Sequence, residues 1–181
     1  MLPNTRPVDD PVSLWNMQQY LLTEAEQLLG SRDPTKIIYR PTFHPNGPFL
    51  RNTPNLDGAF AQMSFNARDY WPTVVYELAH ETVHLLNPTV GHTNWFEEGV
   101  AVEFSIYAQS LFKLPSYQPQ TGAYLEALQL VRSLPNNPFI SAKKIRAKIG
   151  ALNTLNISRI QDTFPKICPS LAKKLCEQFL P

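Results

Sequence analysis

The sequence predicts an α+β fold with an α-rich C-terminal half. A long segment with helical periodicity is followed by two short apolar runs, and after residue 70 nearly all periodic segments are helical. Hydrophobic residues make up 43% of the 181 residues and charged residues 17%. This composition supplies a core and differs from that of a disordered chain. We therefore expect one domain, residues 1–181, of ordinary size.

The expected domain has three consecutive parts. Residues 10–70 are expected to form an N-terminal helix and a short mixed or antiparallel sheet, and residues 71–112 two long helices. Residues 120–181 are expected to form a helical subdomain. The two helices of the middle part carry the motifs on which the functional argument depends.

The N-terminal helix has clear boundary signals. Asp10 is a typical N-cap, Pro11 suits the first helical position, and Gly30 ends the pattern. The apolar run 36–40 is predicted to be a strand, and Asn46-Gly47 marks a turn within the Pro-, Asn- and Gly-rich stretch that follows.

A second strand is predicted at residues 58–66, at an edge of the sheet beside the first of the two long helices. The exposed edge of such a strand is where a peptide could add by strand pairing.

Start and stop signals also define the later helices. Trp71-Pro72 opens the first long helix and Asn87-Pro88 closes it, while the second covers about 95–112. The remaining predicted helices follow: 122–134 capped by Thr121, 142–149 capped by Ser141 and ended by Gly150, 157–164 and 169–180.

Charge and cysteine content exclude several classes of protein. The net charge is +1, so no overall field favours nucleic acid or an anionic membrane, and we expect neither partner. Cys168 and Cys176 are too few for a disulfide scaffold, and we expect semi-buried thiols. No signal-like or membrane-spanning run is present, which predicts a cytoplasmic protein, while the oligomeric state stays open.

The segment HETVH places two histidines and a glutamate on one helix. His80 and His84 are four residues apart, so they share a face and can bind one metal ion. Glu81 is rotated roughly 100° from His80, which suits a general base acting on a water bound to that metal.

A third metal ligand must come from elsewhere in the chain. A catalytic zinc has three protein ligands and one open position. A third histidine six residues after His84 is excluded, because that position is Val90. The candidates downstream are His92, Glu97, Glu98 and Glu103.

HETVH followed by WFEEGVA resembles the gluzincin metallopeptidases, especially the aminopeptidase N-like branch and its small single-domain relatives. The branch has a tryptophan, two residues, then Glu-Gly-x-Ala, and these positions match Trp95, Glu98, Gly99 and Ala101. The resemblance covers about residues 58–105. The 13 residues between His84 and Glu98 are fewer than in most gluzincins.

The resemblance implies a small zincin-like domain that hydrolyses peptide bonds in peptides or proteins with a zinc ion, Zn2+. It implies His80, His84 and Glu98 as metal ligands and Glu81 as the base. Gly99 and Ala101 would let the second helix pack close to the first. Peptide hydrolysis also needs a donor to the oxyanion, and among the downstream tyrosines we choose Tyr124.

Several residues keep two interpretations. His92 is either a loop histidine or a cleft residue, and Glu97 would be the ligand if the helix phase differed. Glu77 and Glu103 either orient a metal-binding histidine or are ordinary helix charges. Tyr107 and Tyr117 remain alternative oxyanion donors.

Two other functions remain open at this stage. One is a zinc protein that binds peptides with little turnover. The other is a helical interaction or regulatory domain without metal. Bound zinc would distinguish a metallopeptidase from the domain without metal. A Glu81 variant that keeps zinc but changes turnover would distinguish a metallopeptidase from a zinc protein that only binds peptides.

Overall fold

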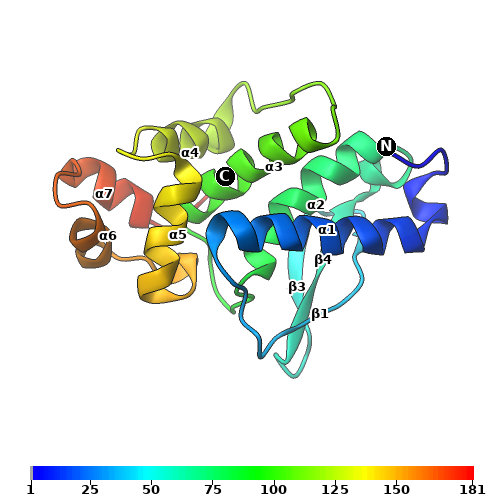
Figure 1. The fold of residues 1–181 in the computed structure, drawn as a ribbon, viewed down its shortest axis with the longest axis horizontal. Coiled ribbons are helices and arrows are strands. Elements are labelled where there is room, and N and C mark those ends of the chain that lie inside the picture. Colours follow the sequence, from blue (N-terminus) through cyan, green and yellow to red (C-terminus); the bar gives the residue numbers. More distant parts are fainter. Residues whose placement is uncertain (1) are drawn as a thin grey trace.

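The computed structural model describes residues 2–181 and confirms the α+β class. The helices are α1 (Pro11–Leu29), α2 (Trp71–Leu85), α3 (Trp95–Leu111), α4 (Gly122–Arg132), α5 (Pro138–Ile149), α6 (Ile157–Thr163) and α7 (Pro169–Cys176). The strands are β1 (Ile37–Ile38), β2 (Thr42–His44), β3 (Phe49–Asn52) and β4 (Gly58–Ser64). Short 3-10 turns are η1 (Pro7–Asp9), η2 (Phe65–Arg68) and η3 (Leu152–Thr154). In Figure 1 the strands lie below α1 and α2, and α4 to α7 gather at the other end of the molecule.

Helix α1 begins and ends where the sequence predicts. The carboxylate of Asp10 accepts a hydrogen bond from the backbone N–H of Ser13 at 2.9 Å, and Pro11 is the first helical residue. Gly30 follows the last turn with φ of 94°, a conformation that glycine adopts at little cost. The buried Gln18 side chain donates to the hydroxyl of Thr82 at 2.9 Å, which joins α1 to α2 inside the core.

The sheet is mixed, and β4 is its central strand. β4 pairs in parallel with β1 and β2 on one side and antiparallel with β3 on the other. The placement of residues 58–66 at a sheet edge is therefore wrong. The stretch predicted as turn contains β2 and β3, whose few residues lie between Pro-, Asn- and Gly-rich bends that hide strand periodicity. The exposed edge beside the candidate site belongs to β3.

Helix α2 lies at the centre of the fold. It packs against α1, α3, β4 and β3, and most of its side chains are buried. Figure 1 shows α1 crossing in front of α2. Glu77 ties α2 to the end of β4, because its carboxylate accepts from the N–H and the hydroxyl of Ser64 at 2.8 and 2.5 Å. The helix that carries HETVH is thus fixed on several sides.

The close helix contact at Gly99 is with α4, which differs from the expected packing of α3. A β-carbon on Gly99 would lie 2.3 Å from the carbonyl oxygen of Ala127 and 2.6 Å from a methyl carbon of Val131. Both residues belong to α4. The missing side chain of Gly99 therefore allows a close approach of α3 to α4, and not to α2 as the sequence suggested.

Two details of the C-terminal part also differ from expectation. Helix α5 begins at Pro138, and its cap is Asn137, whose side-chain oxygen accepts from the N–H of Phe139 at 2.9 Å. Ser141, the predicted cap, is buried inside the first turn. Cys168 is exposed at the start of α7, whereas Cys176 is half-buried.

A buried arginine joins α5 to the ends of α1 and α2. The Arg146 guanidinium donates to the carbonyl oxygens of Leu29 and Ser31, both at 2.9 Å, and of Gly30 at 2.5 Å. It also donates to the side-chain oxygen of Asn87, which follows α2. These bonds use the carbonyls that the end of α1 leaves without helical partners. None of the described helices is long and apolar enough to cross a membrane.

Candidate metal centre

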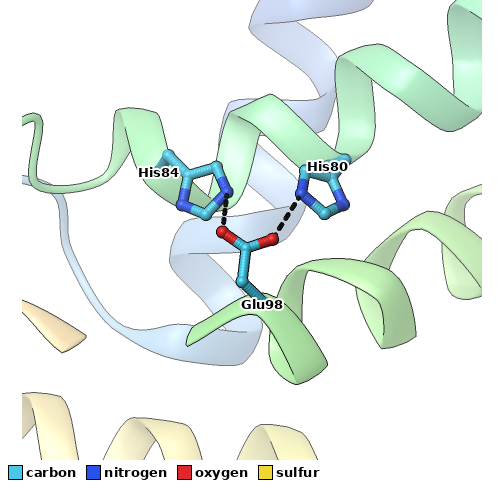
Figure 2. A group of neighbouring side chains, drawn as sticks. All are labelled: His80, His84 and Glu98. Atoms are coloured by element: carbon cyan, nitrogen blue, oxygen red, sulfur yellow. Dashed lines mark hydrogen bonds and ion pairs between the residues drawn. The ribbon is translucent and has the colours of Figure 1, made fainter. Parts of the chain in front are cut away.

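The two motif histidines project from one face of α2. His80 and His84 are one helical turn apart, and their ring centroids are separated by 5.1 Å. Figure 2 shows both rings turned toward the Glu98 carboxylate, which comes from α3. Both histidines are buried, with exposed fractions of 8% and 9%.

The first turn of α3 sets the position of Glu98. Asn94 caps the helix, and its side-chain oxygen accepts from the N–H of Glu97 at 2.9 Å, while its amide donates to the carbonyl of Leu152. The N–H of Trp95 donates to the carbonyl of Glu177 at 3.2 Å. The start of α3 is thus held by η3 and by the segment that follows α7, so Glu98 has a defined approach to α2.

The three side chains lie close enough together to hold one metal ion. Nε2 of His80 lies 3.1 Å from Oε2 of Glu98, and Nε2 of His84 lies 3.6 Å from Oε1 (Figure 2). One ligand atom from each residue lies within 4.8 Å of the others. Tetrahedral ligands at about 2.0–2.2 Å from zinc are roughly 3.3–3.6 Å apart. The donor set, two imidazoles and a carboxylate, also matches catalytic zinc. The residues therefore fit the metal that the sequence suggested.

The charges of this group are strongly coupled. Burial by itself would lower the pKa of His84, but the carboxylates of Glu98 and Glu97 raise it to about 10. Burial opposes ionisation of Glu98, yet the charge on His84 and a hydrogen bond from His80 lower its pKa to about 2. A proton on His84 thus balances the buried carboxylates, and a divalent cation could take over that role.

Glu97 supports His84 from the side away from Glu98. Its Oε1 lies 3.1 Å from Nδ1 of His84, and its Oε2 is buried without a protein partner among the described residues. A carboxylate only accepts, so Nδ1 carries the proton of this bond. This arrangement leaves Nε2 of His84 to face Glu98, as in metal-bound histidines oriented by a carboxylate.

Glu81 lies beside the metal-binding group at the junction of two cavities. The residue is 3% exposed, and its carboxylate has no hydrogen bond to another residue in the described part of the chain. Burial raises its pKa, while His84 and His80 act in the opposite direction. A carboxylate at this position could accept a proton from a water in the cleft and return it.

The two cavities form one cleft across the group. The first cavity has a volume of about 320 Å³. We call its polar part the polar lobe, and this part is lined by Asn52, Asn87, Thr89, His92, Thr93 and Asn153. The second cavity has a volume of about 450 Å³. We call its tyrosine-rich part the aromatic lobe, and this part is lined by Tyr76, Glu77, Tyr117, Pro119, Gln120 and Tyr124. Pro48, His80, Glu81 and Tyr124 border both cavities.

Tyr124, the expected oxyanion donor, borders both cavities beside His80. Its ring centroid is 5.8 Å from that of His80, in an edge-on arrangement. Burial, with smaller effects of Glu98 and Glu81, raises the pKa of Tyr124 to about 12. Its hydroxyl therefore keeps its proton at neutral pH and can donate a hydrogen bond into the cleft.

The structure separates the remaining candidates. His92 lines the polar lobe, and Tyr117 lines the aromatic lobe. Tyr107 lies elsewhere and donates to Glu24 at 3.0 Å, and Glu103 pairs with Arg132 at 2.7 Å. Neither Tyr107 nor Glu103 lines the cleft.

Sequence reasoning missed two features of this site. The support of His84 by Glu97 depends on how α3 crosses α2, which no local pattern reveals. The contribution of β3 to the polar lobe, through Phe49, Leu50 and Asn52, was hidden because this strand was not predicted.

Comparisons with known proteins add no assignment. No protein-family model matches the chain, and no curated protein or solved structure matches it either. The functional argument therefore rests on the geometry of the site.

Proposed function

We propose that this protein is a small zinc metallopeptidase of the gluzincin type. The observation that carries the proposal is the group formed by His80, His84 and Glu98, with Glu81 beside it in an open cleft. A metal site used only for stability would normally be closed by a fourth protein ligand. Here His80, His84 and Glu98 would hold the ion at the wall of an open cavity, and the neighbouring Glu81 carboxylate has no hydrogen-bond partner among the described residues.

A zinc ion held by these three residues would supply Lewis acidity, which polarises a carbonyl group and makes water nucleophilic near neutral pH. Glu81 would accept the proton of the attacking water and deliver it to the leaving amine. The position of Glu81 supports this role, because its carboxylate borders both cavities beside the two histidines.

Tyr124 would donate its hydroxyl hydrogen to the oxygen that becomes negatively charged as water attacks. The raised pKa of Tyr124 keeps that hydrogen on the hydroxyl. The Tyr124 ring lies beside the His80 ring, so the hydroxyl belongs to the same part of the cleft as the metal-binding group. Such a donor stabilises the charge that develops in the transition state more than it stabilises the bound peptide.

The edge of β3 offers a place for an extended peptide. Among the described residues β3 pairs only with β4, and Phe49, Leu50 and Asn52 line the polar lobe. A peptide that adds to this edge gains main-chain hydrogen bonds and would cross the cleft next to Glu81.

Hydrolysis of a peptide library tests the proposal. Zinc-loaded wild-type protein is incubated with a mixture of proteome-derived peptides, and the products are identified by mass spectrometry. Wild-type protein should cleave peptides, Glu81→Gln should retain zinc and lose at least about a hundredfold in rate, and Glu103→Gln should resemble wild type. Glu103 is the matched control because it lies on α3 outside the cleft.

Two outcomes would contradict the proposal. Equal rates for wild type and Glu81→Gln would remove Glu81 from the chemistry. A zinc-loaded wild-type protein that binds peptides and cleaves none would favour the peptide-binding alternative.

A further inference from the structure

One wall of the aromatic lobe is a loop, and contacts with α3 hold this loop in place. Tyr117 is 60% exposed, yet both its backbone groups are fixed by one buried side chain. The amide of Gln109, from α3, donates to the carbonyl of Tyr117 and accepts from its N–H, both at 2.8 Å. The protein therefore uses a buried polar group to hold an exposed aromatic residue at the rim of the cleft.

Tyrosines surround this lobe. The rings of Tyr76 and Tyr117 meet edge-on with centroids 5.2 Å apart, and Tyr124 closes the side toward His80. Burial, together with Tyr117 and Tyr124, raises the pKa of Tyr76. The lobe thus offers aromatic rings and hydroxyl groups, and tyrosine hydroxyls are uncharged at neutral pH.

Acidic side chains outnumber basic ones along the cleft. Four carboxylates line it, those of Glu77, Glu81, Glu97 and Glu98, and a zinc ion would offset two of their charges. No lysine or arginine within residues 2–181 lines either cavity. Glu77 lies in the aromatic lobe itself. Ser64 supplies one hydrogen bond to each of its oxygens, and each oxygen can accept another.

We propose that the aromatic lobe binds a basic side chain, lysine or arginine, of the peptide substrate. The proposal rests on the proposed function, because it concerns the substrate of the same cleft. A cation over tyrosine rings gains cation–π attraction, and its N–H groups can reach the Glu77 carboxylate and the hydroxyls. A phenylalanine side chain would stack on the rings but would leave these polar groups without partners. A glutamate side chain would be repelled.

The same charges make a free peptide carboxylate a poor ligand. A carboxypeptidase holds the terminal carboxylate of its substrate, which requires a cationic or strongly donating partner. The cleft lacks such a cation in the described part of the chain. A free carboxyl end would therefore have to use the amide and hydroxyl donors of the polar lobe, whereas an internal peptide segment carries no such charge.

Peptide binding tests this assignment separately from catalysis. The probes are alanine-based peptides with blocked ends and one guest residue, Lys, Arg, Gln, Phe or Glu. Their dissociation constants are measured on the Glu81→Gln protein, with and without zinc, while wild type is assayed for cleavage of the same peptides. We expect the Lys and Arg peptides to bind roughly three- to tenfold more tightly than the Gln peptide, and the Glu peptide most weakly.

Variants at the rim of the lobe locate the effect. Gln120 is exposed, and among the described residues its side chain donates only to the carbonyl of Gln118, so Gln120→Lys and Gln120→Glu should fold normally. Gln120→Lys should weaken the Lys peptide roughly two- to fivefold, and Gln120→Glu should strengthen it by a similar factor.

Tyr117→Ala should also weaken the Lys peptide, by roughly two- to fivefold. The control Tyr70→Ala removes a tyrosine of similar exposure, 61%, outside the cleft and should change nothing.

Each result decides one question. Equal or tighter binding of the Phe peptide, no response to the charge at position 120, or no measurable binding of the Lys peptide would overturn the assignment. Preferential binding of Lys without cleavage by zinc-loaded wild type would keep it and overturn the peptidase function alone. Cleavage by zinc-loaded wild type without any preference for basic guest residues would overturn the assignment and leave the peptidase function in place.

Discussion

Oε1 of Glu97 lies 3.1 Å from Nδ1 of His84, so the residue before Glu98 supports one of the histidines that Glu98 faces. Neighbouring residues in the first turn of α3 thus approach opposite nitrogens of one imidazole ring. This relationship orients the His84 ring so that Nε2 faces Glu98.

Removal of this support should weaken zinc binding. Glu97→Ala should lower the zinc affinity by about ten- to a hundredfold, because His84 loses the acceptor that orients it. Glu97→Gln should lose less zinc affinity than Glu97→Ala, since the amide oxygen of glutamine can still accept a hydrogen bond from Nδ1 of His84. Competition with a chromogenic chelator measures the affinities, with Glu103→Ala as the control on the same helix. Zinc affinity unchanged in Glu97→Ala would contradict this role.

Zinc binding should release a proton from His84. In the metal-free protein Glu98 and Glu97 raise the pKa of His84 to about 10, against about 6.5 in an unfolded chain. The stability due to this proton is complete below the unfolded pKa and is lost as the pH rises through about 10. Zinc must displace the proton, so its affinity should rise about tenfold per pH unit between those values.

Calorimetry in buffers of different ionisation enthalpy counts the protons released. We expect about one from His84 near pH 8, because the Glu98 carboxyl, with a pKa of about 2, is already ionised. A zinc affinity independent of pH across this window would contradict the coupling between the histidine and the two carboxylates.

Tyr124→Phe should reduce turnover with little effect on zinc or peptide binding. The change removes only the hydroxyl that we assign to the developing oxyanion, and such donors contribute about 10²–10³ in rate. Steady-state rates are compared with those of Tyr20→Phe, which alters an exposed tyrosine of α1. A rate like that of wild type would move the donor elsewhere, with His92 the next candidate in the cleft.

Gly99→Ala should destabilise the fold by about 1–3 kcal/mol. The added carbon would lie 2.3 Å from the backbone oxygen of Ala127, so α4 must shift. Because α4 carries Tyr124, turnover should also fall. Denaturant unfolding measures the stability, and Ser110→Ala, an exposed change on the same helix, should stay within about 0.5 kcal/mol of wild type. Unchanged stability would show that the helices separate at little cost.

Arg146→Ala should destabilise the fold by about 2–5 kcal/mol. The change leaves carbonyls at the end of α1 and the side chain of Asn87 without their donor. Arg146→Lys should not restore stability, because one ammonium group cannot reach all of these acceptors. Lys144→Ala, on the exposed side of α5, is the control in thermal unfolding. Equal melting temperatures for the two alanine variants would contradict the assignment.

Local sequence signals predicted the helices well. Asp10 and Gly30 mark the ends of α1, and HETVH with WFEEGVA placed His80, His84 and Glu98 on two helices that the structure brings together. These predictions depend on hydrophobic periodicity and caps, which act over a few residues.

The features missed depend on contacts between distant segments. β3 has four residues and is defined by its pairing with β4, so residues 41–57 contain no pattern long enough to show it. Gly99 was assigned to the wrong neighbour because a small residue shows that a close approach exists but not which helix makes it. The pairing of Glu97 with His84 depends on the same crossing of helices.

The most direct test of the central claim is the zinc content of the purified protein after zinc is offered and the excess removed. We expect about one zinc per chain in wild type, Glu81→Gln and the control His44→Ala, whose histidine lies outside the cleft, and a loss of that zinc in His84→Ala. A wild-type protein without zinc, or equal zinc in His84→Ala, would contradict the metal site and with it the proposed peptidase.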